Sequence, residues 1–155
     1  MQLQQKITPF LTFGNQAEEA ARYYVSVIPD SELGPITKNP MTGTAMTVEF
    51  SLAGLSFVAL NMGQPCEPSM AFSIAVACDS QEEVDTLWAK LTDGGEAVQC
   101  GWLKDRFDVY WQIVPRVMSE YLKTSDAETA GRVMGAMMQM VKLDIAALER
   151  AYQGK

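Results

Sequence analysis

The chain has 155 residues and a net charge of −7, with 19 acidic residues against 12 basic ones, and it contains no histidine. An acidic chain without a basic stripe is poorly suited to neutralise phosphates, so we expect no nucleic-acid partner. The lack of histidine excludes Ser-His-Asp and Cys-His catalysis, together with every metal site that depends on imidazole.

Association with a membrane and secretion are not expected either. No apolar run reaches the roughly 18 residues of a membrane span, and the Gln-rich residues 1–5 lack the apolar region of a signal peptide. We therefore expect a cytoplasmic protein with no membrane partner. Three cysteines, Cys66, Cys78 and Cys100, are odd in number and lack zinc-type spacing, which favours reduced, partly buried thiols.

The first half of the chain predicts one helix and four strands. An apolar stripe over residues 17–28 predicts the helix, which Asn15 caps with Glu18 as its partner. Ala53-Gly54 suits a two-residue hairpin turn, and residues 63–68 are the expected link to the second half. The expected strands cover residues 7–13, 31–38, 46–52 and 55–61.

The same order of elements then repeats. A strand is predicted over residues 71–78, followed by a helix that begins at a capping box of Ser80 and Glu83 and stops at Gly94-Gly95. Two hairpin strands are expected on either side of the charged residues 104–106. In the last strand, alternate residues share a face: Tyr110, Gln112 and Val114 on one, and Val109, Trp111 and Ile113 on the other.

The C-terminal part predicts helices only. We expect a short helix or turn over residues 115–122, a longer helix that Ser125 caps with Glu128, and a last helix that Asp144 caps. Methionines at helical spacing are typical of pliable core or subunit-interface packing. The stripe of the longer helix comprises Ala130, Val133, Met134, Met137, Met138 and Val141.

These elements predict an α+β fold made of two tandem β-α-β-β(-β) modules and a C-terminal helical tail. We expect a single domain over residues 1–155, in which the first module covers about 6–62 and the second about 69–115. The tail covers about 116–153. Overlaying residues 14–20 on 78–84 brings two Glu-Glu pairs into register, which agrees with a repeated plan.

Several motifs resemble the PhnB-like branch of the vicinal oxygen chelate superfamily, which includes glyoxalase I, bleomycin-resistance proteins and extradiol dioxygenases. This branch is often described as 3-demethylubiquinone-9 3-methyltransferase-like. The resemblance covers nearly the whole chain and is most specific between residues 99 and 115. The motifs are ITPFLTF (7–13), NQAEEAARYY (15–24), MTVEF (46–50), FVALN (57–61), SQEEVD (80–85), QCGWLKD (99–105), WQIVP (111–115) and DIAALE (144–149).

The resemblance implies two curved sheets that enclose a cleft, the glyoxalase/bleomycin-resistance fold, and a homodimer. In metal-using relatives four ligands, usually His and Glu, hold a divalent ion there. Their places fall here near Thr8, near Ala59 or Asn61, near Ser73 and at Gln112. Because these side chains offer no carboxylate or imidazole, the expectation is a cleft with no metal and no cofactor.

From the residues themselves, three assignments have two interpretations each. Gln112, with Tyr110 beside it on the same face, either bonds a ligand or satisfies neighbouring backbone. Glu49 either lines the cleft as a base or faces solvent. Trp102 either forms a cleft wall or packs in the core.

Three functions remain open at this stage. The first is a metal-free protein that binds an unidentified small molecule. The alternative is an enzyme of the same superfamily, a lyase, a dioxygenase or the methyltransferase-like activity of the family description, that uses an unrecognised site. The third is a dimeric module whose tail helices bind a protein partner.

Overall fold

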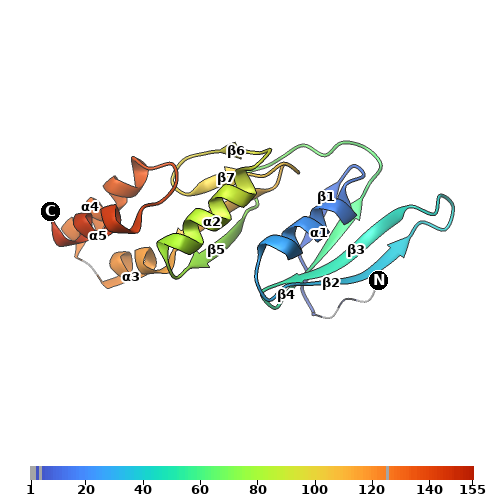
Figure 1. Cartoon of the computed structure of the whole chain (residues 1–155), viewed down its shortest axis with the longest axis horizontal. Coiled ribbons are helices and arrows are strands. Elements are labelled where there is room, and N and C mark those ends of the chain that lie inside the picture. Colours follow the sequence, from blue (N-terminus) through green and yellow to red (C-terminus); the bar gives the residue numbers. More distant parts are fainter. Residues whose placement is uncertain (1–2, 4, 125) are drawn as a thin grey trace. The chain divides into compact units, whose positions relative to one another are not determined.

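The computed structural model of the chain describes residue 3, residues 5–124 and residues 126–155 (Figure 1). It divides into two compact units, Met1–Glu67 and Pro68–Lys155. Each unit contains one four-stranded sheet and one helix that follows the sheet's first strand. The predicted α+β fold of two βαβββ modules with C-terminal helices is confirmed. No helix in the described part of the chain is long and apolar enough to cross a membrane.

The first unit forms sheet A, in the order β1-β4-β3-β2. β1 pairs with β4 in parallel, and the other neighbours are antiparallel. The first strand is shorter than predicted, because it begins at Phe10 rather than at residue 7. Its elements are β1 (Phe10–Phe13), α1 (Ala17–Val27), β2 (Glu32–Lys38), β3 (Ala45–Leu52) and β4 (Leu55–Asn61).

The apolar stripe of α1 packs on one face of sheet A. Tyr24 of α1 meets Phe50 of β3 with ring centroids 6.2 Å apart, and Phe50 stacks on Phe57 of β4 at 5.4 Å. All three side chains are buried. The turn between β3 and β4 has positive φ at Ala53 (48°) and Gly54 (88°), the left-handed pair that a two-residue hairpin requires.

The predicted cap of α1 by Asn15 is wrong. The helix follows Gln16, whose side chain makes no capping bond. Instead the Ala17 N–H donates to Oδ1 of Asn61, at 2.9 Å and 44 residues away in sequence. The side-chain amide of Asn61 therefore caps the helix, a role that a residue next to the helix usually has.

The second unit forms sheet B, in the order β5-β8-β7-β6, with β5 and β8 parallel. β5 begins at Ile74, later than predicted, because it pairs only with β8 and that pairing starts at Trp111. The two-residue strand β6 was not predicted. The elements are β5 (Ile74–Cys78), α2 (Gln81–Thr92), β6 (Glu96–Ala97), β7 (Trp102–Lys104), β8 (Tyr110–Pro115), α3 (Arg116–Thr124), α4 (Ala127–Met138) and α5 (Ile145–Gln153).

Two predicted caps of this unit are confirmed. Ser80 accepts from the Glu83 N–H at 3.1 Å, and the Glu83 carboxylate accepts from the Asp79 N–H at 2.7 Å. Asp144 accepts from the Ala147 N–H at the start of α5. The predicted cap at Ser125 lies outside the described residues, and Asp126 caps α4.

A buried carboxylate organises the connection between β7 and β8. Asp105 is 1% exposed and accepts from the N–H groups of Phe107 (2.8 Å) and Val109 (3.1 Å). Its other oxygen accepts from Nε1 of the fully buried Trp111 at 2.8 Å. The charged stretch predicted as an ordinary hairpin connection thus contains a core residue.

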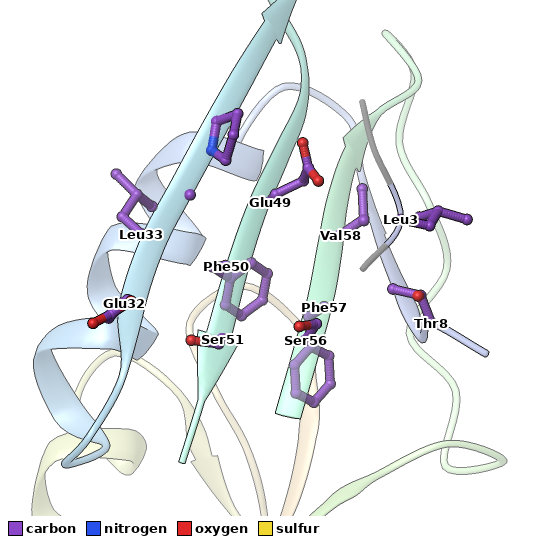
Figure 2. Close-up of a pocket in the computed structure, with 12 residues that line it drawn as sticks. Leu3, Thr8, Glu32, Leu33, Glu49, Phe50, Ser51, Ser56, Phe57 and Val58 are labelled. Atoms are coloured by element: carbon purple, nitrogen blue, oxygen red, sulfur yellow. The ribbon is translucent and has the colours of Figure 1, made fainter. Parts of the chain in front are cut away.

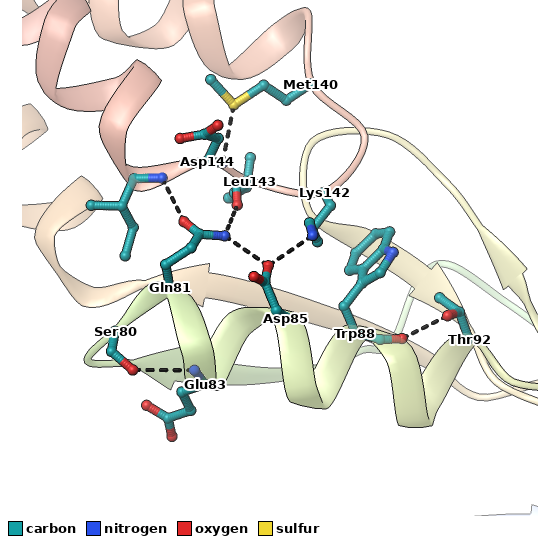
Figure 3. A network of polar contacts seen from close by, with 11 residues as sticks. Ser80, Gln81, Glu83, Asp85, Trp88, Thr92, Met140, Lys142, Leu143 and Asp144 are labelled. Atoms are coloured by element: carbon teal, nitrogen blue, oxygen red, sulfur yellow. Dashed lines mark hydrogen bonds and ion pairs between the residues drawn. The ribbon is translucent and has the colours of Figure 1, made fainter.

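The C-terminal tail docks on α2 through polar contacts (Figure 3). Gln81 donates to the Leu143 carbonyl (3.1 Å) and accepts from the Ile145 N–H (2.8 Å), and Lys142 reaches Asp85 at 2.7 Å. The Lys142 ammonium and the Gln81 amide lower the pKa of the Asp85 carboxyl. The segment between α4 and α5 is therefore held along its main chain.

The methionine stripe of the tail is only partly buried. Val133, Leu143 and Leu148 are fully buried. Met134, Met138 and Val141 are 47%, 58% and 46% exposed. Val141 lies beyond α4, which ends at Met138.

The three thiols differ in their burial. Cys78 is 1% exposed, and burial, with the nearby Glu83 and Asp79, raises the pKa of its thiol to about 12. Cys66 is exposed. Because the thiolate is the reacting form, iodoacetamide at pH 8.5 should alkylate Cys66 in the native protein and Cys78 only after unfolding. Peptide mass spectrometry checks this, and labelling of native Cys78 at the rate of Cys66 would contradict it.

Candidate functional site

Each sheet has a face turned away from its first helix, and we call these the far faces of sheets A and B. Alternation along paired strands places residues on them. On sheet A the far face carries Thr47, Glu49 and Ser51 of β3, with Ser56, Val58 and Leu60 of β4 opposite. On sheet B it carries Gln112 and Tyr110 of β8, Trp102 and Lys104 of β7, and Ala75 and Ala77 of β5.

The far face of sheet A holds a pocket of about 120 Å³ (Figure 2). Glu49 and Thr8, two of the predicted site residues, both line it. Glu49 is half-buried and lies directly opposite Val58. The complete lining is Leu3, Thr8, Glu32, Leu33, Gly34, Pro35, Glu49, Phe50, Ser51, Ser56, Phe57 and Val58.

An irregularity in β2 shapes this pocket. The pairing of β2 with β3 shifts between Leu33 and Ile36, so Gly34 and Pro35 together oppose Glu49. Such bulges redirect side chains and are common near functional sites. A side chain at position 34 would place its Cβ 3.0 Å from the Glu49 carbonyl oxygen and 3.2 Å from the Glu49 Cβ. Glycine therefore allows the backbone of β2 to approach Glu49 closely.

Four predicted site residues come together on sheet B. Gln112 pairs directly with Trp102 across β7 and β8, and its Nε2 donates to Oγ of Ser73 at 2.9 Å. Tyr110 lies on the same face, two residues from Gln112, and pairs with Lys104. The side chains are partly exposed rather than buried in the core. Trp111, on the other face, fills that core instead.

Asn61, which was also predicted as a site residue, has a structural role instead. Its Oδ1 accepts from the Ala17 N–H, and its Nδ2 donates to the Ala45 carbonyl at 3.0 Å. Since the side chain bonds the start of α1, it points to the helix side of sheet A. The structure does not bring Asn61 to the far face that carries Glu49.

The residues at the metal-ligand places of relatives do not fit a divalent metal. Thr8 and Ser73 offer hydroxyls and Gln112 an amide, all weak ligands for transition metals compared with imidazole and carboxylate. In the described part of the chain, no group of three or more His, Cys, Asp or Glu side chains lies where it could hold a metal ion.

Sequence patterns alone missed part of the pocket. Ser51 and Ser56 could have been found, because they alternate with core residues on the predicted strands 46–52 and 55–61. Gly34 and Pro35 could not be predicted to line the pocket from the sequence, because the position of a bulge depends on how two strands pair.

Comparison with known proteins places these features in a family. The sequence model of the family described as 3-demethylubiquinone-9 3-methyltransferase matches residues 5–114. The chain belongs to this PhnB-like family. A solved PhnB protein from Bacillus cereus is 31% identical to it, over 72% of this chain and 99% of that one, with a TM-score of 0.65. The predicted family is confirmed. A search among curated proteins gives no match.

More distant structures share the fold alone. Protein PA1353 from Pseudomonas aeruginosa is 21% identical over 72% of this chain and 97% of its own, with a TM-score of 0.61. The fosfomycin resistance protein FosX from Listeria monocytogenes is 15% identical over 80% and 100%, with a TM-score of 0.57. These matches show the glyoxalase-like fold that was predicted from the sequence.

The family match ends inside the second unit. It stops at residue 114, within β8. The tail helices α3, α4 and α5 therefore lie beyond the matched region.

Proposed function

We propose that this PhnB-like protein binds a small, partly aromatic molecule on the far face of sheet B, without using a metal ion. The observation that carries the proposal is the arrangement of Trp102, Gln112 and Ser73 on sheet B. An aromatic plane there lies directly opposite an amide that Ser73 orients. Small-molecule sites commonly combine an aromatic wall with a few placed polar groups.

The side-chain amide of Gln112 has a hydrogen-bond acceptor available for a ligand. Nε2 of Gln112 donates to Ser73, whereas Oε1 accepts no hydrogen bond from any residue that the structure describes. The amide is fixed by one bond and presents a free acceptor beside the Trp102 indole. This geometry suits a flat ligand that carries an N–H or O–H donor at its edge.

An enzymatic function is the second candidate, and the family description, which names a methyltransferase, is what favours it. Methyl transfer from a nucleoside cofactor would call for a glycine-rich turn between a strand and a helix. Between β1 and α1 the chain offers only Gly14, followed by Asn15 and Gln16. A crystal structure of a FosX mutant is described with Mn(II) and a phosphonic acid, whereas in the described part of this chain no group of three or more His, Cys, Asp or Glu side chains could hold a metal ion. Binding is therefore the better-supported function.

Indole tests the proposal at sheet B, because it pairs a stacking plane with one N–H donor. Titration of the ¹⁵N-labelled protein should shift the signals of Trp102 Nε1–H and of the Gln112 amide. Gln112→Leu should weaken binding about three- to ten-fold, the effect of losing one hydrogen bond worth about 1 kcal/mol. 1-Methylindole, which lacks the donor, should bind the wild type and the variant alike.

The exposed Gln139, at the end of α4, provides the matched control. Gln139→Leu should leave indole binding unchanged. Indole shifts that avoid sheet B, or equal affinity of Gln112→Leu and wild type, would refute the site.

A further inference from the structure

We infer that the site on sheet B takes a flat ring that carries a hydrogen-bond donor and a hydrogen-bond acceptor on adjacent atoms, as a cyclic amide (a lactam) does. The inference rests on the proposed function, because it uses the same face of sheet B. It adds a second polar group to the ligand and assigns the recognition of that group to the hydroxyl of Ser73.

The hydroxyl of Ser73 accepts one hydrogen bond and has a donor available. Its Oγ accepts from Nε2 of Gln112 at 2.9 Å, and neither side chain makes another hydrogen bond with a residue that the structure describes. A serine hydroxyl that accepts a bond still has one hydrogen to donate, and it rotates to suit a partner. The pair therefore offers an acceptor, Oε1 of Gln112, and a donor, Oγ–H of Ser73.

The bond between the two side chains favours the Ser73 hydroxyl as the donor to the ligand. Hydrogen bonds in a chain polarise one another, so a hydroxyl that accepts a bond becomes a stronger donor. A lactam closes this chain into a ring: its N–H donates to Oε1 of Gln112, Nε2 of Gln112 donates to Ser73, and the Ser73 hydroxyl donates to the lactam carbonyl. A ligand that has an N–H alone leaves the ring open.

The surface beside the Gln112 amide is apolar and open. Ala75 of β5 lies directly opposite Gln112, and Ala77 lies opposite Val114. Both alanines are exposed, and Val114 is half-buried. Because an alanine side chain is a single methyl group, β5 leaves the amide accessible on the side away from Trp102, its neighbour on β7. A flat ring thus has an apolar floor while its edge reaches the two polar groups.

The charges on this face favour a neutral ligand over an anion. Lys104 of β7 shares the face with Gln112, and its ammonium lies 3.4 Å from a Glu96 carboxylate oxygen and 3.8 Å from one of Asp108. A ligand carboxylate would have to compete with both of these acids for the lysine. A lactam carries no charge and is recognised by the amide and hydroxyl groups alone.

Three probes with the same bicyclic frame test the inference. Indole has an N–H alone, 2-oxindole has an N–H beside a C=O, and 1-methyl-2-oxindole has the C=O alone. In NMR titrations of the ¹⁵N-labelled full chain, 2-oxindole should shift the side-chain amide signals of Gln112. It should bind about three- to ten-fold tighter than either of the other probes, the effect of one additional hydrogen bond.

Ser73→Ala separates donation to the ligand from orientation of the Gln112 amide. The variant should weaken binding of 2-oxindole about five-fold and binding of indole by less than about two-fold. Ser119→Ala, at an exposed position of α3, is the matched control and should change neither affinity. Spectra of Ser73→Ala that match the wild type away from β5 and β8 show that the variant is folded.

The outcomes separate this inference from the proposed function. Indole that shifts Trp102 and Gln112 and binds as tightly as 2-oxindole overturns the lactam and leaves the proposed function standing. Equal losses for indole and 2-oxindole in Ser73→Ala show that Ser73 only orients Gln112, and they overturn its role as a donor to the ligand. If neither probe binds to the wild type, the proposed function and this inference both fail.

Discussion

Asp105→Ala is expected to lower the free energy of unfolding by about 3–5 kcal/mol, the range for removing one partner from a buried charged network. The carboxylate accepts from two backbone N–H groups and from Nε1 of Trp111, at 2.8 to 3.1 Å. Alanine removes the acceptor of all three hydrogen bonds in a site that is 1% exposed at residue 105. The β7–β8 connection should lose its shape, and with it the positions of Trp102 and Gln112.

Urea unfolding followed by tryptophan fluorescence measures this effect. Asp108, in the same connection, is the control. Its side chain is 57% exposed, and its ion pair with Lys104 is long, at 3.8 Å. Asp108→Asn retains a residue that tolerates the φ of 67° found there, and it should cost less than about 0.5 kcal/mol. Similar losses for the two variants would show that Asp105 does not organise the hairpin.

Leu143→Ala is expected to cost about 2–5 kcal/mol, the usual range for a buried leucine. Leu143 is fully buried between α4 and α5. It lies so close to Gly101 that a Cβ there would be 2.9 Å from Leu143 Cδ1. Its removal opens a cavity between the tail and the loop that precedes β7.

Thermal or urea unfolding of the full chain tests this prediction. Val141→Ala is the matched control, since Val141 is 46% exposed and should lose little. If Leu143→Ala is as stable as Val141→Ala, the tail does not form part of the core of the second unit.

The order of strands and helices could be predicted because it depends on local patterns. Ser80 and Glu83 stand three residues apart, and the structure makes the bonds that this spacing predicts. Ala53-Gly54 likewise makes its turn from its own backbone preferences. The cap of α1 was missed because it comes from Asn61, and no local pattern reports a contact over 44 residues.

The candidate site was predictable in part for the same reason. Alternation alone placed Gln112 and Tyr110 on one face and Trp111 on the other, as the register of β8 has them. The burial of Asp105 was not predictable, because a charged residue in a turn is usually solvated. Only the folded hairpin brings the Trp111 indole to its carboxylate.

The two main-chain bonds that join the loop before β7 to the tail have a practical consequence. The N–H groups of Cys100 and Gly101 donate to the carbonyls of Met140 and Val141, at 2.9 and 2.8 Å. Because only backbone atoms take part and the side chain at position 141 is 46% exposed, this side chain can be exchanged. A spectroscopic label attached there would report on undocking of the tail without disturbing the bonds that hold it.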